Sequence, residues 1–171
     1  MNNKKRSLAV QIDACNQQYG TNYQYLTPCN LYGEHDNFEN DSKAHFVTAL
    51  LKKIYNAKSS GGESIQLFGT GKPLRQFMHA GDLARVIKQV IEKDVYESFN
   101  VSTPENLSIK DIAEKALISC GAGDLGINYD NTKPDGQFRK DVSNEKMMKI
   151  MPDFEFTDLS DGLLKTFKSI S

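Results

Sequence analysis

Helical and strand-like segments alternate along this chain of 171 residues, and this alternation limits its fold more than any other feature of the sequence. In the helical segments, apolar residues recur every three or four positions, as on the buried face of an amphipathic helix. The segments between them are short apolar runs bounded by glycine, proline and polar residues. Such alternation favours an α/β fold in which helices cover a mainly parallel sheet.

Local signals predict where the elements end. Gly20 supplies a left-handed stop for the first helix, Pro28 ends the first strand because it lacks a backbone N–H, and Asp82 is a candidate cap for the third helix. Ser108 and Asp111 have the spacing of a capping box. The predicted helices cover residues 7–19, 47–58, 83–91, 109–120, 144–150 and 159–170. The predicted strands cover residues 23–26, 65–68, 75–79, 98–101 and 127–129. Residues 33–42 and 131–140 are predicted to form loops.

The charges of the chain nearly cancel, since Lys and Arg total 21, Asp and Glu total 22, and the formal net charge is -1. No long-range field therefore attracts the chain to a polyanion, and we expect neither nucleic acid nor membrane as a partner. The longest apolar runs, such as residues 46–51, are far shorter than the roughly 20 residues that span a bilayer. Residues 1–5 do not lead into the apolar stretch of a signal peptide.

The cysteines bear on the cellular compartment. Cys15, Cys29 and Cys120 are an odd number and lack the spacing of metal ligands. Free thiols are typical of a reducing cytosol. The sequence therefore predicts a cytoplasmic protein without a metal site.

The first candidate site motif is Asn30-Leu31-Tyr32-Gly33, directly after a predicted strand. Loops in this position of an open α/β sheet usually meet ligands, and an Asn amide can both donate and accept a hydrogen bond. The alternative is an ordinary turn with Gly33 at positive φ and Tyr32 packed beneath it.

The second candidate is His45, at the start of a predicted helix and after a loop rich in acidic residues. A histidine in such a place can exchange protons near neutral pH, although a surface or capping histidine is commoner. Lys52 and Lys53 fall within a quadrant of His45 on the same helix. The alternative for both lysines is the solvated face of an amphipathic helix.

The third candidate is the segment from Gly69 to Arg75, which superficially resembles a phosphate-binding loop. Its spacing is not that of a P-loop, and an extended segment follows it instead of a helix. Arg75 can still clamp a diphosphate through two parallel hydrogen bonds. The alternative is a hairpin with a solvated arginine.

The fourth candidate is the loop Lys133 to Lys140, which brings three cations together around a turn. A loop of this kind can close over an anionic ligand. The alternative is solvated surface.

In order along the chain, these motifs resemble those of the GDP-L-fucose synthases, which are extended short-chain dehydrogenases/reductases. The elements that carry the resemblance are Asn30-Leu31-Tyr32-Gly33, Asp36-Asn37-Phe38, His45, Gly69-x-Gly71-x-Pro73-x-Arg75-x-Phe77-x-His79, Asp82-Leu83-Ala84 and Lys133-Pro134-Asp135-Gly136-x-x-Arg139-Lys140. The Asp-Asn-Phe and Lys-Pro-Asp-Gly elements indicate the fucose-forming branch, whereas the others recur across nucleotide-sugar epimerases and dehydratases.

The resemblance implies an α/β fold that combines a substrate-binding lobe with the last strands and helices of a Rossmann-type parallel sheet, an incomplete NAD(P)-binding domain. The sheet pieces are expected at about residues 1–33 and 65–101, and the substrate lobe at about 34–64 and 102–171. Enzymes of this family convert GDP-4-keto-6-deoxy-D-mannose to GDP-L-fucose by 3,5-epimerisation and NADPH-dependent reduction. The complete enzyme is expected to be a homodimer that binds NADP and a GDP-sugar.

The resemblance covers only the carboxyl half of such an enzyme, from about Lys5 to Phe167. In the family, the glycine-rich dinucleotide fingerprint, the catalytic Ser and the epimerising Cys belong to the amino half. We therefore expect this chain to be inactive on its own.

The resemblance also assigns roles to individual residues. Lys5 matches the lysine of the family's Tyr-x-x-x-Lys pair, which lowers the pKa of the tyrosine, and His45 matches the acid of the epimerisation. The positions that contact the cofactor are Lys5, Pro28, Cys29, Asn30, Leu31 and His45. The positions that hold the GDP-sugar are Asn30, Lys53, Phe68, Arg75 and Lys133.

Four positions depart from the family pattern. Lys53 stands where the family has Arg, Phe68 where it has Trp, Gly81 where it has Asp and Thr48 where it has Pro. Lys53 lacks the bidentate fork of Arg, and Phe68 lacks the indole donor. Two further interpretations therefore stay open. One is another NAD(P)-dependent nucleotide-sugar epimerase or dehydratase that prefers UDP- or dTDP-sugars, and the other is a non-catalytic sugar-nucleotide-binding or assembly module.

Overall fold

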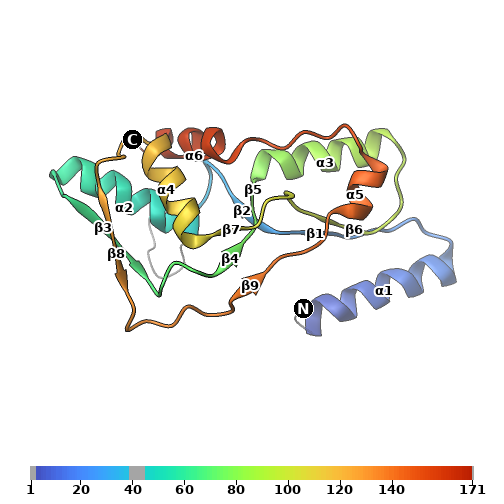
Figure 1. Ribbon diagram of the computed structural model, residues 1–171. Coiled ribbons are helices and arrows are strands. Elements are labelled where there is room, and N and C mark those ends of the chain that lie inside the picture. Colours follow the sequence, from blue (N-terminus) through green and yellow to red (C-terminus); the bar gives the residue numbers. More distant parts are fainter. Residues whose placement is uncertain (1–2, 39–44, 171) are drawn as a thin grey trace.

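The computed structural model describes residues 3–38 and 45–170, with side chains from residue 6 onward, and these residues form an α/β structure (Figure 1). The helices are α1 (Asn3–Tyr19), α2 (Phe46–Ser60), α3 (Ala80–Glu92), α4 (Ile109–Ser119), α5 (Glu145–Ile150) and α6 (Leu159–Lys168). The strands are β1 (Leu26–Pro28), β2 (Asn30–Tyr32), β3 (Ser64–Phe68), β4 (Leu74–Arg75), β5 (Phe77–His79), β6 (Phe99–Val101), β7 (Leu107–Ser108), β8 (Gly126–Asp130) and β9 (Arg139–Lys140).

Parallel pairing dominates the strands, as the alternation of elements predicts. β1 pairs with β6, β2 with β5, and β3 with β8, and all three pairs are parallel. β4 lies between β7, to which it is antiparallel, and β9, to which it is parallel. Because the carboxyl ends of parallel strands meet at the same edge, residues that follow β2 and β5 are brought together.

Two hydrophobic clusters hold these elements together. The first lies between α2, β3, α4 and α6, and the second between α3, β5, β6 and α5. On α2, Val47, Leu50, Leu51 and Ile54 recur at helical spacing and are at most 1% exposed. Burial of each such side chain contributes about 2 kcal/mol. Gly61, in the left-handed conformation with φ of 67°, ends this helix.

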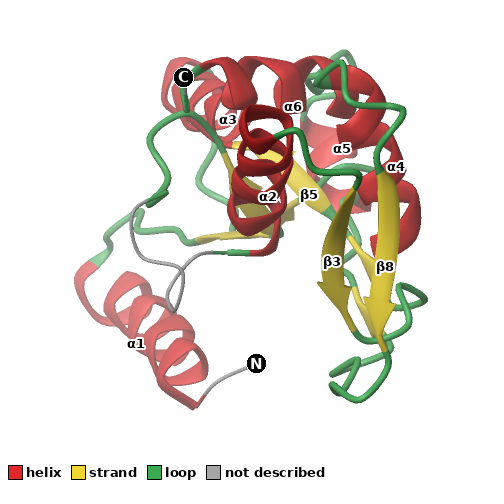
Figure 2. Cartoon of the chain, turned by 90° about the vertical axis from the view of Figure 1, so that its left-hand side faces the viewer, coloured by secondary structure: helices red, strands yellow, loops and turns green. Residues whose placement is uncertain are grey.

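Helix α1 stands apart from the two clusters (Figures 1 and 2). Leu8 and Val10 are 53% and 67% exposed. The side chain of Asn16 donates to the carbonyl of Tyr23 and accepts from its N–H, which ties the end of α1 to the segment before β1. Gly20, with φ of 63°, ends the helix as its sequence position predicts.

The first strand differs from the prediction. It covers Leu26–Pro28 instead of residues 23–26, and Pro28 lies within it opposite Val101. The N–H of Cys29 donates to the carbonyl of Val101 at 2.9 Å, so the ladder bond comes from the residue after the proline. The missing donor of Pro28 therefore costs the pair nothing.

Three further predictions about local structure are wrong. Residues 30–32 form strand β2 rather than a turn, and Gly33 is not among the residues with positive φ. A Cβ at Gly33 would lie 3.3 Å from the Cβ of Ala80, a tight contact, so the close approach of this residue to the start of α3 favours glycine there. Asp82 does not cap α3, because His79 does so by accepting from the N–H of Gly81. Residues 139–140, predicted as loop, form β9.

Most of the remaining predicted elements are confirmed. Ser108 and Asp111 form the predicted capping box of α4, and Gly121 follows that helix with φ of 63°.

Within the described residues, no helix has the length and apolar character needed to cross a bilayer. The same residues contain no group of three His, Cys, Asp or Glu side chains placed to hold a metal ion.

Candidate functional site

A groove of about 1290 Å³ lies where the carboxyl ends of β2 and β5, the first turns of α2 and the end of β3 converge. It brings together eight of the site residues that the family resemblance selects, namely Pro28, Cys29, Asn30, Leu31, His45, Lys53, Phe68 and Arg75. Lys133 is exposed and is not among the lining residues, although its neighbour Asp135 is. Lys5 lies in α1, and its side chain lies outside the described residues.

Strand β2 supplies the first polar group of the groove. Asn30 pairs with Phe77 of β5, and its side-chain N–H₂ donates to the backbone carbonyl of Gln76 at 2.8 Å. This bond fixes the orientation of the amide and leaves its oxygen available to a ligand.

The segment before β2 gives the groove an apolar wall. Pro28, Cys29 and Leu31 are half-buried there. Burial raises the pKa of the Cys29 thiol to about 11, so this cysteine is neutral at physiological pH. It acts as a small apolar group and not as a thiolate nucleophile.

His45 occupies the N-cap position of α2 with extended backbone, and its side chain makes no capping hydrogen bond. The capping alternative is therefore wrong. The imidazole is exposed and lines the groove, where it can reach a bound ligand.

A neighbouring loop is tied to the same helix. The Thr48 hydroxyl, 1% exposed, donates to the carboxylate of Asp36, which also accepts from the N–H of Asn37 at 2.8 Å. Thr48, which stands where the family has Pro, thus joins the loop after β2 to the first turn of α2.

Lys53 and Phe68 form one side of the groove. The Lys53 ammonium donates to the carbonyl of Gln66 at 2.6 Å and lies 5.1 Å from the centre of the Phe68 ring. The ring is 62% exposed, which leaves a broad aromatic surface for contact with a planar group.

Arg75 projects from β4 and lines both the groove and a second cavity of about 570 Å³. One guanidinium nitrogen donates to the carbonyl of Leu74 at 2.7 Å, and the side chain is half-buried. Because β4 pairs with β7 and β9, the predicted hairpin alternative is wrong. The remaining guanidinium donors can take part in anion binding.

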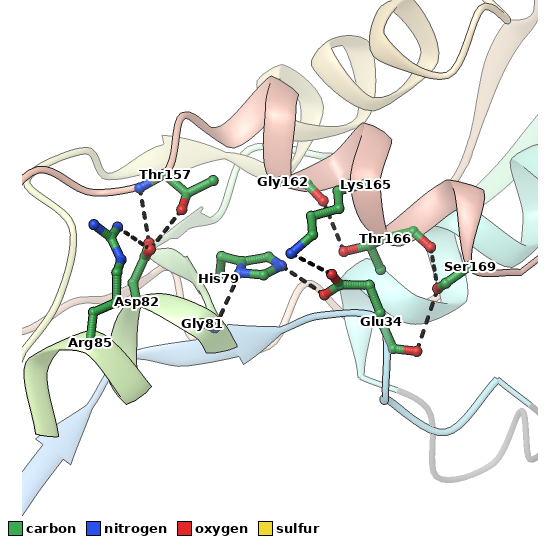
Figure 3. Close-up of polar contacts among 10 residues, drawn as sticks. All are labelled: Glu34, His79, Gly81, Asp82, Arg85, Thr157, Gly162, Lys165, Thr166 and Ser169. Carbon is green, nitrogen blue, oxygen red and sulfur yellow. Dashed lines mark hydrogen bonds and ion pairs between the residues drawn. The ribbon is translucent and has the colours of Figure 1, made fainter. Parts of the chain in front are cut away.

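An ionic cluster in the lining of the groove joins His79, which belongs to the Gly69–His79 motif, to two residues that no motif selects, Glu34 and Lys165 (Figure 3). Glu34 receives a 2.7 Å contact from the Lys165 ammonium of α6 and lies 2.9 Å from Nε2 of His79. Nδ1 of His79 accepts from the N–H of Gly81 at 3.1 Å, so the proton of the neutral imidazole is on Nε2, which donates to Glu34. The cluster joins the ends of β2 and β5 to the last helix.

Besides the Glu34 cluster, a second set of polar contacts, centred on Asp82, holds the start of α6 (Figure 3). Asp82 is 1% exposed, and its carboxylate accepts from the backbone N–H of Thr157 at 3.0 Å and from its hydroxyl at 2.6 Å. Arg85 compensates this buried charge at 2.6 Å and also donates to the carbonyl of Glu155. The contacts of Glu34 with Lys165 and of Asp82 with Thr157 together fix α6 beside the groove.

Because of the ion pair of Glu34, we expect the free energy of unfolding to fall in the acid pH range. The ion pair with Lys165, with a smaller contribution from His79, lowers the pKa of Glu34 from 4.5 to about 2. A lowered pKa in the folded state means that the stabilisation is complete above about pH 4.5 and is lost as the pH falls towards about 2. Since the carboxylate is 22% exposed and Lys165 is 65% exposed, solvent screens the pair, and we expect a contribution of about 0.5–1 kcal/mol.

Urea unfolding at several pH values tests this expectation. Glu34→Gln should be less stable than the parent chain near neutral pH, and the difference should shrink as the pH falls from about 4.5 to about 2. Lys165→Met, which removes the largest cause of the shift, should behave similarly. A stability difference that stays constant with pH would contradict the ion-pair explanation.

Comparisons with known proteins agree with the fold and the motifs. The model of the NAD dependent epimerase/dehydratase family matches residues 3–102. The GDP-L-fucose synthase of Dictyostelium discoideum is 33% identical over 165 residues, which are 93% of this chain and 50% of that protein. The GDP-L-fucose synthase of Escherichia coli strain K12 is 30% identical over 167 residues, 91% of this chain and 51% of that protein.

Among solved structures, a GDP-L-fucose synthetase from Naegleria fowleri bound to NADP superposes with a TM-score of 0.84 at 27% identity. The match covers 97% of this chain and 53% of that one. This chain thus spans about half the length of the relatives it matches. The comparisons confirm the predicted resemblance to the GDP-L-fucose synthases and the Rossmann-type α/β fold.

Proposed function

This chain belongs to the NAD dependent epimerase/dehydratase family, and we propose that it is the carboxyl half of a GDP-L-fucose synthase-like enzyme. The complete enzyme would convert GDP-4-keto-6-deoxy-D-mannose to GDP-L-fucose by 3,5-epimerisation and NADPH-dependent reduction. The observation that carries this proposal is one groove that collects eight of the expected site residues from three separate stretches of the sequence, 28–31, 45–53 and 68–75. Relatives named GDP-L-fucose synthase support the same assignment.

The groove residues fit an NADP cofactor at one end. Ligands of open α/β sheets bind at the carboxyl ends of parallel strands, and residues 28–31 run from the end of β1 into β2. The half-buried Pro28, the neutral thiol of Cys29 and Leu31 offer apolar contacts that suit a nicotinamide ring, and Asn30 offers an amide oxygen. When bound, NADPH would supply the hydride for reduction at C4. Lys5 would lower the pKa of the tyrosine that protonates the reduced oxygen.

His45 would work in the epimerisation. The 4-keto group of the substrate acidifies the neighbouring C–H bonds, so a base and an acid on opposite faces of the sugar can invert C3 and C5 through an enolate. His45 would be the acid of that pair, because an imidazole can hold and release a proton near neutral pH. Its exposed position in the groove without a capping bond supports this role.

The GDP-sugar would be held by charge and by stacking. Arg75 and Lys133 would meet the diphosphate or the sugar oxygens, and Asn30 would accept a hydrogen bond. Lys53 and Phe68 would contact the nucleotide, with Phe68 as the aromatic surface.

We also propose the division of the chain that the resemblance implies. Residues of about 1–33 and 65–101 would belong to the Rossmann part, and those of about 34–64 and 102–171 to the substrate lobe. The two parts share a sheet, because β3 of the first pairs with β8 of the second. The complete enzyme would be a cytoplasmic homodimer.

Titration calorimetry with GDP-mannose, UDP-glucose and dTDP-glucose tests the proposed substrate class. We expect this chain to bind the GDP-sugar at least about 10-fold more tightly than the other two. A preference for UDP- or dTDP-sugars would favour another epimerase or dehydratase of the family. Binding of none of the three would contradict the proposal.

A separate prediction concerns activity. We expect no oxidation of NADPH when this chain alone is mixed with GDP-4-keto-6-deoxy-D-mannose, because the family's catalytic Ser and Tyr and its glycine-rich fingerprint belong to the amino half. The absorbance of NADPH gives the readout, with the Escherichia coli enzyme as a positive control. Measurable turnover by the purified chain would contradict this prediction.

A further inference from the structure

We propose that Asp135 is a positioning residue that clasps the loop at residues 131–138 onto the turn at Gly69–Gly71 and thereby fixes Lys133 beside the groove. This inference rests on the proposed function, because it concerns how the GDP-sugar is held. Asp135 lines the groove, whereas the side chain of Lys133 is exposed on the same loop.

One residue engages both oxygens of the Asp135 carboxylate. Oδ1 accepts from the backbone N–H of Thr70 at 2.6 Å, and Oδ2 accepts from the Thr70 hydroxyl at 2.7 Å. These two bonds lower the pKa of the carboxyl group, so it is ionised at neutral pH. Two bonds from one residue define the position of the carboxylate more strictly than a single contact does.

The turn is shaped to receive this carboxylate. Gly69 has φ of 78°, and a Cβ there would lie 2.2 Å from Oδ1 of Asp135. Gly71 has φ of 75°, and a Cβ there would lie 2.5 Å from the Tyr129 ring. A side chain at Gly69 would occupy the space of the Asp135 carboxylate, and a side chain at Gly71 would occupy the space of the Tyr129 ring in β8, so the two glycines allow the turn to pack against both the loop and β8.

Backbone bonds join the turn and β4 to this loop at the two ends of the loop, and within the loop the N–H of Lys133 donates to the carbonyl of Asp130 at 3.1 Å. The N–H of Gly69 donates to the carbonyl of Asp130 at 3.0 Å, and the N–H of Leu74 donates to the carbonyl of Phe138 at 2.8 Å. Asp135 bonds to Thr70 between these two rungs. The contact therefore limits the movement of the segment that carries Lys133. Because the segment is already restricted, Lys133 loses less conformational entropy when it binds an anion.

Removal of Asp135 should change GDP-sugar affinity in opposite directions if Asp135 positions Lys133 and if it is an ordinary surface charge. Removal of a carboxylate beside an anionic ligand removes repulsion and should leave binding unchanged or strengthen it. If Asp135 positions Lys133, its removal should instead weaken binding by about 3- to 10-fold.

Titration calorimetry of GDP-mannose with this chain tests the inference through a double-mutant cycle. We expect Asp135→Ala to weaken binding about 3- to 10-fold in the parent chain and less than about 2-fold in the Lys133→Ala background, because the clasp acts through that lysine. Asp135→Asn, which keeps an acceptor for the Thr70 N–H, should restore part of the loss. Asp124→Ala removes an exposed carboxylate that does not line the groove and serves as the charge-matched control.

The outcomes separate the two levels of the proposal. Parent chain that fails to bind GDP-mannose, or Lys133→Ala that binds it normally, would overturn the assigned role of Lys133 and the clasp with it. If Lys133→Ala weakens binding but Asp135→Ala does not, or if the two effects add, only the clasp is overturned. Thr70→Val, which removes one hydroxyl and keeps the backbone donor, decides the question if Asp135→Ala does not fold, since a clasp predicts weaker binding for it as well.

Discussion

In a full-length enzyme that contains this chain, His45→Gln should slow the exchange of solvent deuterium into C3 and C5 of GDP-4-keto-6-deoxy-D-mannose by ~10²-fold or more, while GDP-sugar affinity stays nearly unchanged. Glutamine approximates the size of the imidazole but cannot give up a proton near neutral pH. Because His45 makes no capping bond to α2, its loss removes a proton donor without removing a helix cap. Mass spectrometry of the sugar after incubation in D₂O measures the exchange.

His35 provides the matched control for this experiment. It is exposed and lines the same groove, but the family resemblance gives it no role in proton transfer. His35→Gln should therefore leave the exchange rate within about 3-fold of the parent. An unchanged exchange rate in His45→Gln would show that His45 is an ordinary surface histidine.

The sequence predicts an element well where both of its ends carry local signals. The capping box of Ser108 and Asp111 starts α4, and Gly121 follows it in the left-handed conformation, so the helix lies close to the predicted residues. β1 lacks such signals. Its position depends on pairing with β6, a strand distant in the sequence, and neighbouring apolar residues such as Tyr23 and Tyr25 made an earlier start equally consistent with the pattern. Tertiary pairing decides such short strands.

The same contrast holds for the site. The resemblance selects His45, Lys53 and Arg75, and the fold brings all three to one groove. Glu34 and Lys165 could not be found in this way, because they lie far apart in the sequence and belong to no shared motif. Only the packing of α6 against the ends of β2 and β5 brings the two charges to 2.7 Å. Long-range ion pairs of this kind leave no periodic signal in a single sequence.

Arg75→Ala should weaken GDP-sugar binding by about 10- to 100-fold, because charge-assisted hydrogen bonds to a diphosphate contribute ~1.5–3 kcal/mol each. The guanidinium of Arg75 is positioned for this role by its place on β4 between two neighbouring strands. Its bond to the carbonyl of Leu74 uses one donor and holds the group half-buried at the groove. The ligand would thus meet a cation whose orientation is already set.

Two further variants test whether the paired guanidinium donors of Arg75, and not its positive charge alone, bind the diphosphate. Arg75→Lys keeps the charge but loses the paired donors, so it should give an intermediate loss of affinity. Lys72→Ala removes a neighbouring cation that does not line the groove, and its effect should stay below about 2-fold. If calorimetry showed GDP-mannose binding to Arg75→Ala with the parent affinity, the solvated-arginine interpretation would hold, and the diphosphate would have to be bound elsewhere in the groove. An equal loss in Lys72→Ala would indicate that the general positive field of the turn, and not the guanidinium, attracts the ligand.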